Sequence, residues 1–357
     1  MSAPPLHAPA TIRAADLSHP ASCARIDAYV RAHPEGTPFH LTAWCIAVAR
    51  GCGQKAHVLL AERGDSSIAG LVPLTEIASR LFGRALASSG FAVGGGILAE
   101  DDRIAAALAD AAWALGERLN CPSVELRGGR VADPRWHAKD DVYAGFVRPL
   151  AADADAELLA IPRKQRAEVR RALGFDLTVE TGTAMRDRDA HYTVYAESVR
   201  NLGTPVFPRA LFEAVLDGFG DEADILTVRH AGKAIASVLS LYYGGTVMPY
   251  WGGGTADART WRANDLMYYA LMNHARTRGC TRFDFGRSKR GTGAFAFKKN
   301  WGFEPRPLGY AVRTADGAEP REINPLDPRY QRKIEMWRKL PLWAANRIGP
   351  FISRGLG

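Results

Sequence analysis

The sequence predicts an α/β protein made of two similar halves, each with a mixed sheet covered by helices. The same order of hairpin strands, helix and strand occurs in residues 56–127 and again in residues 224–286. Antiparallel hairpins followed by a helix and a further strand are typical of a mixed sheet, and not of successive βαβ units. A chain of 357 residues, 47% of them hydrophobic, is also long enough for two domains.

In the first half, apolar segments on either side of a Gly-Asp turn predict a hairpin over 56–62 and 68–77. A helix is expected over 101–119, because apolar residues recur there at helical spacing after an acidic start. In the second half the pattern predicts strands at 224–229, 234–243 and 246–251, a helix over 264–278, and a strand at 281–285.

The two halves also align residue by residue at their closing strands. Cys121 and Glu125 correspond to Cys280 and Asp284 at the same offset, which indicates an internal duplication. We therefore expect an N-terminal domain over 1–152, a C-terminal domain carrying the site over 153–320, and a basic, aromatic tail over 321–357.

A net charge of +8 favours an anionic partner, such as a phosphate-bearing substrate, RNA or an anionic membrane face, although it also suits plain solubility. No segment has the length of a membrane span or of a signal peptide, so we expect a cytoplasmic protein. Five scattered cysteines without a CxxC pair, and single histidines, predict neither a disulfide framework nor a bound metal.

A short basic helix is expected over 161–174, between the halves. Arg163, Arg166 and Arg170 would share one of its faces, and Glu168 is the single acid available to neutralise them. Such a row of guanidinium groups suits bidentate contacts with phosphate. The alternative is a solvated stripe of charge.

Four motifs, at 200–208 (RNLGTPVFP), 250–254 (YWGGG), 283–288 (FDFGRS) and 297–302 (FKKNWG), together resemble the Fem family. The resemblance covers about residues 39–310 and is closest to the FemAB-like proteins associated with exosortase (PEP-CTERM) exopolysaccharide systems. It implies two tandem GNAT-like domains and a transfer of an acyl group to an amine. It also implies an aminoacyl-tRNA, an acyl-CoA or another acyl carrier as co-substrate, with no bound cofactor.

Two residues are candidates for the chemistry. Asp284 alternates with Phe283 and Phe285 along the last strand, so its carboxylate takes the face opposite the two rings and can orient or deprotonate an amine. The resemblance places Lys298 near the reacting carbonyl, where a cation would stabilise an oxyanion. The alternatives are a carboxylate that bonds the following turn and a plain surface cation.

Further residues are candidates for binding substrate. Arg287 and Ser288 can hold an anionic group, and Phe297 and Trp301 of the last motif can supply an apolar wall. Their signal is weaker than that of the two residues above.

The two earlier motifs supply four more candidates. Asn201 and Thr204 can line an acceptor groove or cap the next helix. Tyr250 and Trp251 can form a stacking platform for a sugar or base, or belong to the core.

The phosphate-binding loop of ordinary acyl-CoA enzymes is not evident. Loose Arg-x-x-Gly-x-Ala matches occur at 80–85, 229–234 and 306–311, and none opens a predicted helix. We therefore predict a Fem-like acyl or aminoacyl transferase acting on a cell-envelope or exopolysaccharide precursor. The alternatives are a non-catalytic module that binds an anionic glycan or lipid-linked intermediate, and an RNA-binding protein.

The tail over 329–357 has seven Arg and Lys residues, one acid (Glu335), and interspersed apolar and aromatic side chains. This composition suits a peripheral contact with the inner membrane. The alternative is that its tryptophans pack back onto the first domain.

Overall fold

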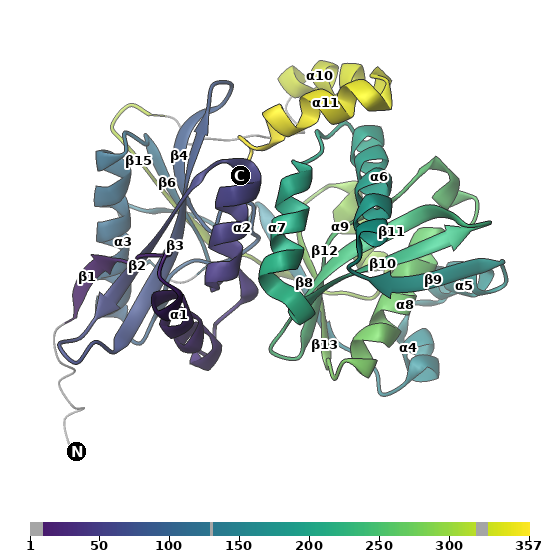
Figure 1. The fold of residues 1–357 in the computed structure, drawn as a ribbon, viewed down its shortest axis with the longest axis horizontal. Helices are drawn as coiled ribbons and strands as arrows, with labels where there is room; N and C mark the ends of the chain where they lie inside the picture. The colour runs from purple at the N-terminus through teal and green to yellow at the C-terminus, as the bar shows by residue number, and fades with distance from the viewer. Residues whose placement is uncertain (1–9, 129–130, 319–327) are drawn as a thin grey trace. The chain divides into compact units, whose positions relative to one another are not determined.

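The computed structural model describes residues 10–128, 131–318 and 328–357, and the chain forms two compact units (Figure 1). The first unit comprises Met1–Lys139, Gly309–Arg321 and Gly355–Gly357, and the second comprises Asp140–Leu308 and Glu322–Arg354. Each unit contains one mixed sheet with helices, so the predicted α/β class is confirmed.

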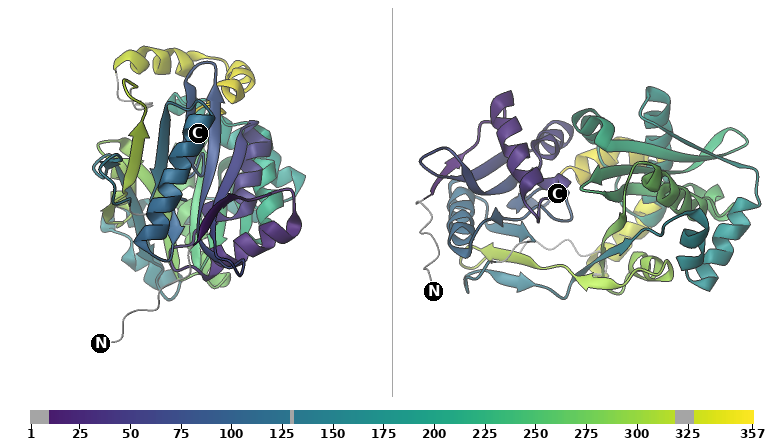
Figure 2. Two further views of the ribbon diagram at one scale, coloured as in Figure 1. Left: turned by 90° about the vertical axis from the view of Figure 1, so that its left-hand side faces the viewer. Right: turned by 90° about the horizontal axis from the view of Figure 1, so that it is seen from below.

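The first sheet has the strand order β1-β2-β3-β4-β6-β15-β7, and β5 pairs with β3. Its strands are β1 (Thr11–Ala14), β2 (Lys55–Glu62), β3 (Ile68–Ser79), β4 (Gly83–Ser88), β5 (Leu98–Ala99), β6 (Ser123–Arg127), β7 (His137–Lys139) and β15 (Tyr310–Thr314). The helices of this unit are α1 (Pro20–Ala32), α2 (Thr42–Cys52) and α3 (Asp102–Arg118). The predicted acidic start of α3 is its N-cap, because the Asp101 carboxylate accepts a hydrogen bond from Ile104 N–H. Figure 2 (left) shows α3 lying along the strands.

The second sheet has the order β14-β8-β13-β12-β11-β10-β9. Its strands are β8 (Tyr143–Pro149), β9 (Leu177–Gly182), β10 (Ala223–His230), β11 (Lys233–Tyr243), β12 (Thr246–Gly254), β13 (Arg282–Lys289) and β14 (Pro305–Pro307). The helices are α4 (Ala154–Ala160), α5 (Arg163–Leu173), α6 (Met185–Leu202), α7 (Arg209–Phe219), α8 (Ala263–Thr277), α9 (Gly293–Asn300), α10 (Pro328–Lys339) and α11 (Leu342–Ser353).

Alternation along β11 separates the two faces of the second sheet. Ala236 and Val238 belong to a hydrophobic cluster with α5 and α8, whereas the hydroxyl of Ser237, between them, lies 3.1 Å from Nδ1 of His191 on α6. Successive side chains of a strand point to opposite faces, so α8 and α6 cover opposite sides of this sheet (Figure 1).

The duplication predicted from the sequence is present in both sheets. β6 follows the long helix α3 and pairs in parallel with β4, and β13 follows the long helix α8 and pairs in parallel with β12. Glu125 and Asp284 are each the third residue of these strands. Their surroundings differ, because Glu125 forms an ion pair at 2.7 Å with Arg127 of its own strand.

Each sheet contains one strand from the other half of the sequence. β8 follows β6 and β7 along the chain but lies between β13 and β14, and β15 follows β14 but lies between β6 and β7. The observed units therefore differ from the predicted division at residue 152, which leaves β8 with the first domain and β15 with the second. The local pattern of a strand specifies its faces and not its pairing partner.

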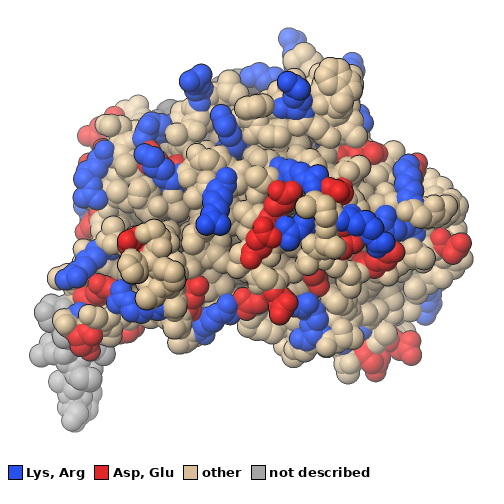
Figure 3. Space-filling view, in the orientation of Figure 1, with Lys and Arg blue, Asp and Glu red and all other residues tan. Residues whose placement is uncertain are grey.

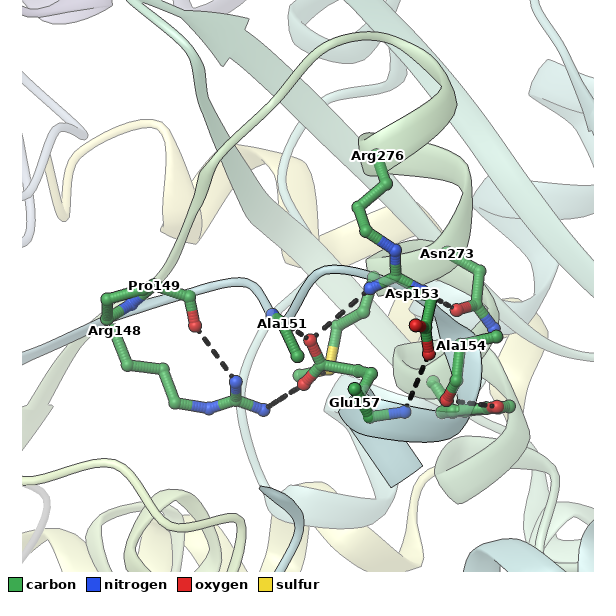
Figure 4. A network of polar contacts seen from close by, with 11 residues as sticks. Arg148, Pro149, Ala151, Asp153, Ala154, Glu157, Asn273 and Arg276 are labelled. Carbon is green, nitrogen blue, oxygen red and sulfur yellow. Dashed lines mark hydrogen bonds and ion pairs between the residues drawn. The ribbon is translucent and has the colours of Figure 1, made fainter. Parts of the chain in front are cut away.

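A buried ion-pair network fixes β8 and the connecting helix α4 to α8 (Figure 4). The Glu157 carboxylate is fully buried and accepts hydrogen bonds from Arg148 Nη2 at 2.6 Å and from Ala151 N–H at 2.8 Å. Arg276 of α8 donates to the same carboxylate at 3.3 Å. A buried charge is tolerated when it is paired in this way.

Candidate active site

Strands β12 and β13 part from each other in the middle of the second sheet. They pair in parallel only at Thr246–Arg282 and Val247–Phe283. Beyond that point β12 follows β11 as far as Gly254, and β13 follows β8 as far as Lys289. The residues of β13 after Phe283 therefore lie where two neighbouring strands have separated.

A β-bulge in β13 positions Asp284 at this point. Asp284 lies opposite Val147 and Arg287 lies opposite Gly145, so one extra residue is accommodated between them. Gly286 takes a φ of +68°, which glycine adopts without strain, and its N–H donates to Asp284 Oδ1 at 2.8 Å. Burial raises the pKa of Asp284, against the effect of this hydrogen bond.

Lys298 reaches the same bulge from α9, which begins at the N-cap Thr292. Its Nζ donates to the carbonyl oxygen of Arg287 at 2.8 Å and lies 5.4 Å from the centre of the Phe146 ring. Removal from water lowers the pKa of Lys298 to about 8, although the Asp284 carboxylate acts in the opposite direction. The two candidates for the chemistry are thus electrostatically coupled at one bulge.

Two buried polar groups lie near these residues in the chain, Ser288 on β13 and Trp301 at the C-cap of α9. Ser288 is 6% exposed and Trp301 is fully buried, and within the described ranges neither Ser288 Oγ nor Trp301 Nε1 has a hydrogen-bond partner. Trp301 and Phe297 both contact the Phe285 ring, so they belong to an aromatic cluster on the α9 side of β13. This is an apolar wall of the kind expected from the sequence.

Arg287 lies on the other face of β13. Its guanidinium is 4.8 Å from the centre of the Tyr143 ring on β8. Asp284 and Arg287 pair with Val147 and Gly145, which are two residues apart on β8 and therefore on one face of the sheet. A cation and a carboxylate thus share this face.

The four candidates from the earlier motifs differ in how far they are buried. Trp251 is 4% exposed and packs edge to face on Phe212 of α7 at 4.8 Å, which makes it part of the core. Tyr250 is half-buried and is the extra residue of a second bulge, in β12. Asn201 and Thr204 are exposed around the end of α6.

The three arginines of the predicted basic helix are on α5 and are not equivalent. Arg163 and Arg170 are exposed, whereas Arg166 is half-buried and donates to the carbonyl of Leu159 at 2.9 Å. Gln165 and Val169 form the buried side of the helix. Arg163 and Arg170 are therefore accessible from solvent, whereas Arg166 has a structural contact.

Sequence reasoning missed a carboxylate at the start of α8. Asp265 lies in the first turn of this helix and accepts a hydrogen bond from Gln165, and burial raises its pKa to about 6. Arg262, the N-cap, has a φ of +53° and pairs with Glu168 of α5 at 2.6 Å. Acids are common in the first turn of a helix, where they are usually exposed. Only the packing of α5 on α8 shows that Asp265 is partly buried.

The loose Arg-x-x-Gly-x-Ala segments lie elsewhere. They fall at the connection of β3 to β4, at the turn between β10 and β11, and between β14 and β15. None of them leads directly into α8, so none can direct the backbone amides of that helix toward a pyrophosphate.

The arrangement of both units is that of the GNAT fold, and comparisons with known proteins agree. Residues 162–299 match the family model described as an acetyltransferase (GNAT) domain. No curated protein matches the sequence significantly. The chain thus carries a GNAT domain in the half that was predicted to hold the chemistry, and the expected enzyme class, an acyltransferase, is confirmed.

Solved structures show the same fold over most of the chain. FemX is 16% identical and superposes with a TM-score of 0.65, covering 87% of this chain and 97% of that one. The tandem GNAT protein from the clavulanic acid biosynthesis pathway is 13% identical, with a TM-score of 0.55 and coverages of 87% and 100%. The L-PGS from Bacillus licheniformis is 12% identical, with a TM-score of 0.55 and coverages of 89% and 97%. The predicted tandem GNAT-like architecture is thereby confirmed.

Proposed function

We propose that this protein forms an amide by transferring an acyl or aminoacyl group from a carrier to an amine, with the reaction at the β13 bulge. The observation that carries the proposal is that Asp284 and Lys298 are both tied to one bulge where neighbouring strands separate. Lys298 Nζ donates to the Arg287 carbonyl in that bulge at 2.8 Å, and the charge of each residue influences the pKa of the other. A carboxylate and an ammonium that are electrostatically coupled at one bulge suit the two requirements of an acyl transfer, a base for the amine and a cation for the oxyanion.

In the proposed reaction the neutral amine attacks the carbonyl carbon of the ester or thioester, and a C–N bond forms. The Asp284 carboxylate takes the proton that the amine nitrogen loses. The Lys298 ammonium stabilises the negative oxygen of the tetrahedral intermediate. When the intermediate collapses, the bond to the carrier breaks, and the departing alkoxide or thiolate takes up the proton.

The directions of the two pKa shifts suit these roles. A pKa of about 8 leaves most Lys298 side chains charged at pH 7. The raised pKa of Asp284 makes its carboxylate a stronger base than an exposed aspartate. The burial that perturbs both groups also strengthens any electrostatic interaction with a developing oxyanion.

The start of α8 favours a donor other than an acyl-CoA bound through its pyrophosphate. A helix N-terminus attracts anions, but here the Asp265 carboxylate lies in the first turn and Glu168 pairs with Arg262 next to it. Two further negative phosphate groups would meet these carboxylates. We therefore favour an aminoacyl-tRNA or another carrier ester, held by the exposed Arg163 and Arg170.

The proposed acceptor is an amine of a cell-envelope or exopolysaccharide precursor. The sequence motifs that resemble the exosortase-associated FemAB-like proteins support this choice, and so does the structural similarity to FemX. A second candidate is a non-catalytic module that binds an anionic glycan or lipid-linked intermediate, which the exposed arginines of α5 favour. In either case we expect a cytoplasmic location.

Mass spectrometry of envelope and exopolysaccharide material tests the proposal. Cells with the full chain should contain an amide-linked mass increment that is missing from cells without the protein and from cells with Asp284→Asn. Identical spectra from all three strains would contradict the transfer. An increment that persists with Asp284→Asn would leave transfer standing and remove Asp284 as its base.

A further inference from the structure

The C-terminal helices α10 and α11 pack on the end of α6 and on the connection that follows it. Ser353 Oγ donates to the carbonyl of Val206 at 2.8 Å, and Arg338 Nη2 donates to the carbonyl of Leu202 at 3.3 Å. Gly349 allows the close approach, since a Cβ there would lie 3.1 Å from the backbone nitrogen of Val206. The two helices therefore have a fixed inner face in the second unit.

Their outer face carries large apolar side chains in solvent. Trp343 is 73% exposed, Phe351 64%, Met336 63% and Ile348 45%. On α11, Trp343, Arg347 and Phe351 follow one another at intervals of four residues and so form one stripe. Its cationic end is Arg354, whose guanidinium lies 5.5 Å from the centre of the Phe351 ring.

The same two helices hold most of the net charge of the chain. Residues 328–354 contain five Arg, two Lys and one acid, Glu335, which makes +6 of the total of +8. In the orientation of Figure 3, Lys and Arg side chains are visible over α10 and α11 at the top of the second unit. The exposed aromatic rings thus lie on helices that carry a large excess of positive charge.

We propose that the outer face of α10 and α11, defined by Met336, Lys339, Trp343, Arg347 and Phe351, binds the surface of an anionic phospholipid bilayer. Aromatic and aliphatic side chains enter the boundary between headgroups and acyl chains, while the cations remain among the lipid phosphates. The helices have 12 residues each, too short to span a bilayer, and among the described residues no helix combines the length and apolarity of a span.

This combination favours lipid over nucleic acid. An RNA duplex offers phosphates to the cations alone, whereas the apolar boundary of a bilayer also lets the exposed Trp343 and Phe351 leave water. The inner face of α11 is already occupied, so its outer stripe is the side available to a membrane. The inference is independent of the proposed transfer reaction.

Co-sedimentation of the full chain with vesicles tests the proposal. The chain should partition onto vesicles of phosphatidylcholine with phosphatidylglycerol, and much less onto phosphatidylcholine alone. Replacing Lys339→Gln and Arg347→Gln together should lower partitioning by about 25-fold, on the basis of about fivefold for each cation. Trp343→Ser with Phe351→Ser should lower it to a similar extent, and 1 M salt should weaken it.

Matched controls distinguish binding through the stripe from nonspecific adsorption to vesicles. Leu81→Ser with Leu159→Ser removes side chains of similar exposure, 67% and 63%, from other parts of the surface and should leave partitioning unchanged. Arg50→Gln with Arg80→Gln is the corresponding control for charge. Equal effects of stripe and control variants would overturn the proposal. So would binding of an RNA duplex, in place of vesicles, that depends on Lys339 and Arg347.

Discussion

Replacing Lys298 with Met should strongly reduce transfer while leaving the fold intact. Met has a similar length and can keep the contacts with Phe146 and Phe285, but it has no charge. Loss of one donor to an oxyanion lowers kcat by about 10²–10³-fold, which corresponds to about 3–4 kcal/mol of activation free energy. Product formation in the mass-spectrometric assay should fall by that factor.

The stability of the Lys298→Met variant follows from the lysine's surroundings. The fall of its pKa from 10.5 to about 8 means that burial disfavours the ammonium by about 3 kcal/mol at pH 7, at about 1.36 kcal/mol per pH unit. The variant removes that cost. It also leaves the Arg287 carbonyl without its donor, at a cost of about 1–3 kcal/mol. The two effects nearly cancel, so the free energy of unfolding should change by less than about 2 kcal/mol.

Urea unfolding of the purified variants therefore distinguishes a catalytic role from a structural one. Lys299→Met is the matched control, because Lys299 is the exposed neighbour on the same helix, and it should change neither activity nor stability. Full activity in Lys298→Met would refute the proposed role. A loss of activity that parallels a large loss of unfolding free energy would make Lys298 a structural residue.

Three other predictions concern pH, the buried network and the exchanged strands. The transfer rate should fall as pH rises through about 8, where Lys298 loses its proton. Lys298→Arg should move that fall to higher pH, whereas Lys299→Arg should not. An unchanged pH profile in Lys298→Arg would contradict this prediction. Glu157→Ala removes the carboxylate that Arg148 and Arg276 share and should lower the free energy of unfolding by about 3–5 kcal/mol, as measured by urea unfolding. The control Asp155→Asn, at an exposed position of the same helix, should lower it by less than about 1 kcal/mol. Fragments 1–152 and 153–357 should not fold separately, because each loses an internal strand of its sheet, and a cooperative unfolding transition by circular dichroism in either fragment alone would be the contrary result.

Local patterns in the sequence determined the secondary structure and the strand on which we propose the site. The predicted strand 123–127 coincides with β6, and the predicted helices over 101–119 and 264–278 differ from α3 and α8 by about one residue at each end. Apolar periodicity, turn glycines and capping acids act over a few residues, so they can be recognised without knowing the fold. Alternation along the strand likewise predicts that the Asp284 side chain lies on the face of the sheet opposite the rings of Phe283 and Phe285.

The sequence was less informative about which side chains are free to bind a substrate. Trp251 was a candidate for a stacking platform but is buried against Phe212, and Arg166 donates to the Leu159 carbonyl. Asp265 escaped notice because its raised pKa depends on burial where α5 packs on α8. Burial is a property of residues brought together from distant parts of the chain, and no local pattern reports it.

By itself, the sequence therefore determined the α/β class, the duplication, the basic helix and the identity of the carboxylate and ammonium that we propose for the reaction. Only the tertiary structure decided that β8 and β15 exchange sheets, that Lys298 Nζ meets the Arg287 carbonyl, and that the outer stripe of α11 is exposed. The physical reason is the range of the interactions. Helix and strand propensities are set by near neighbours, whereas strand partners, desolvation and perturbed pKa values depend on contacts between segments far apart in the chain.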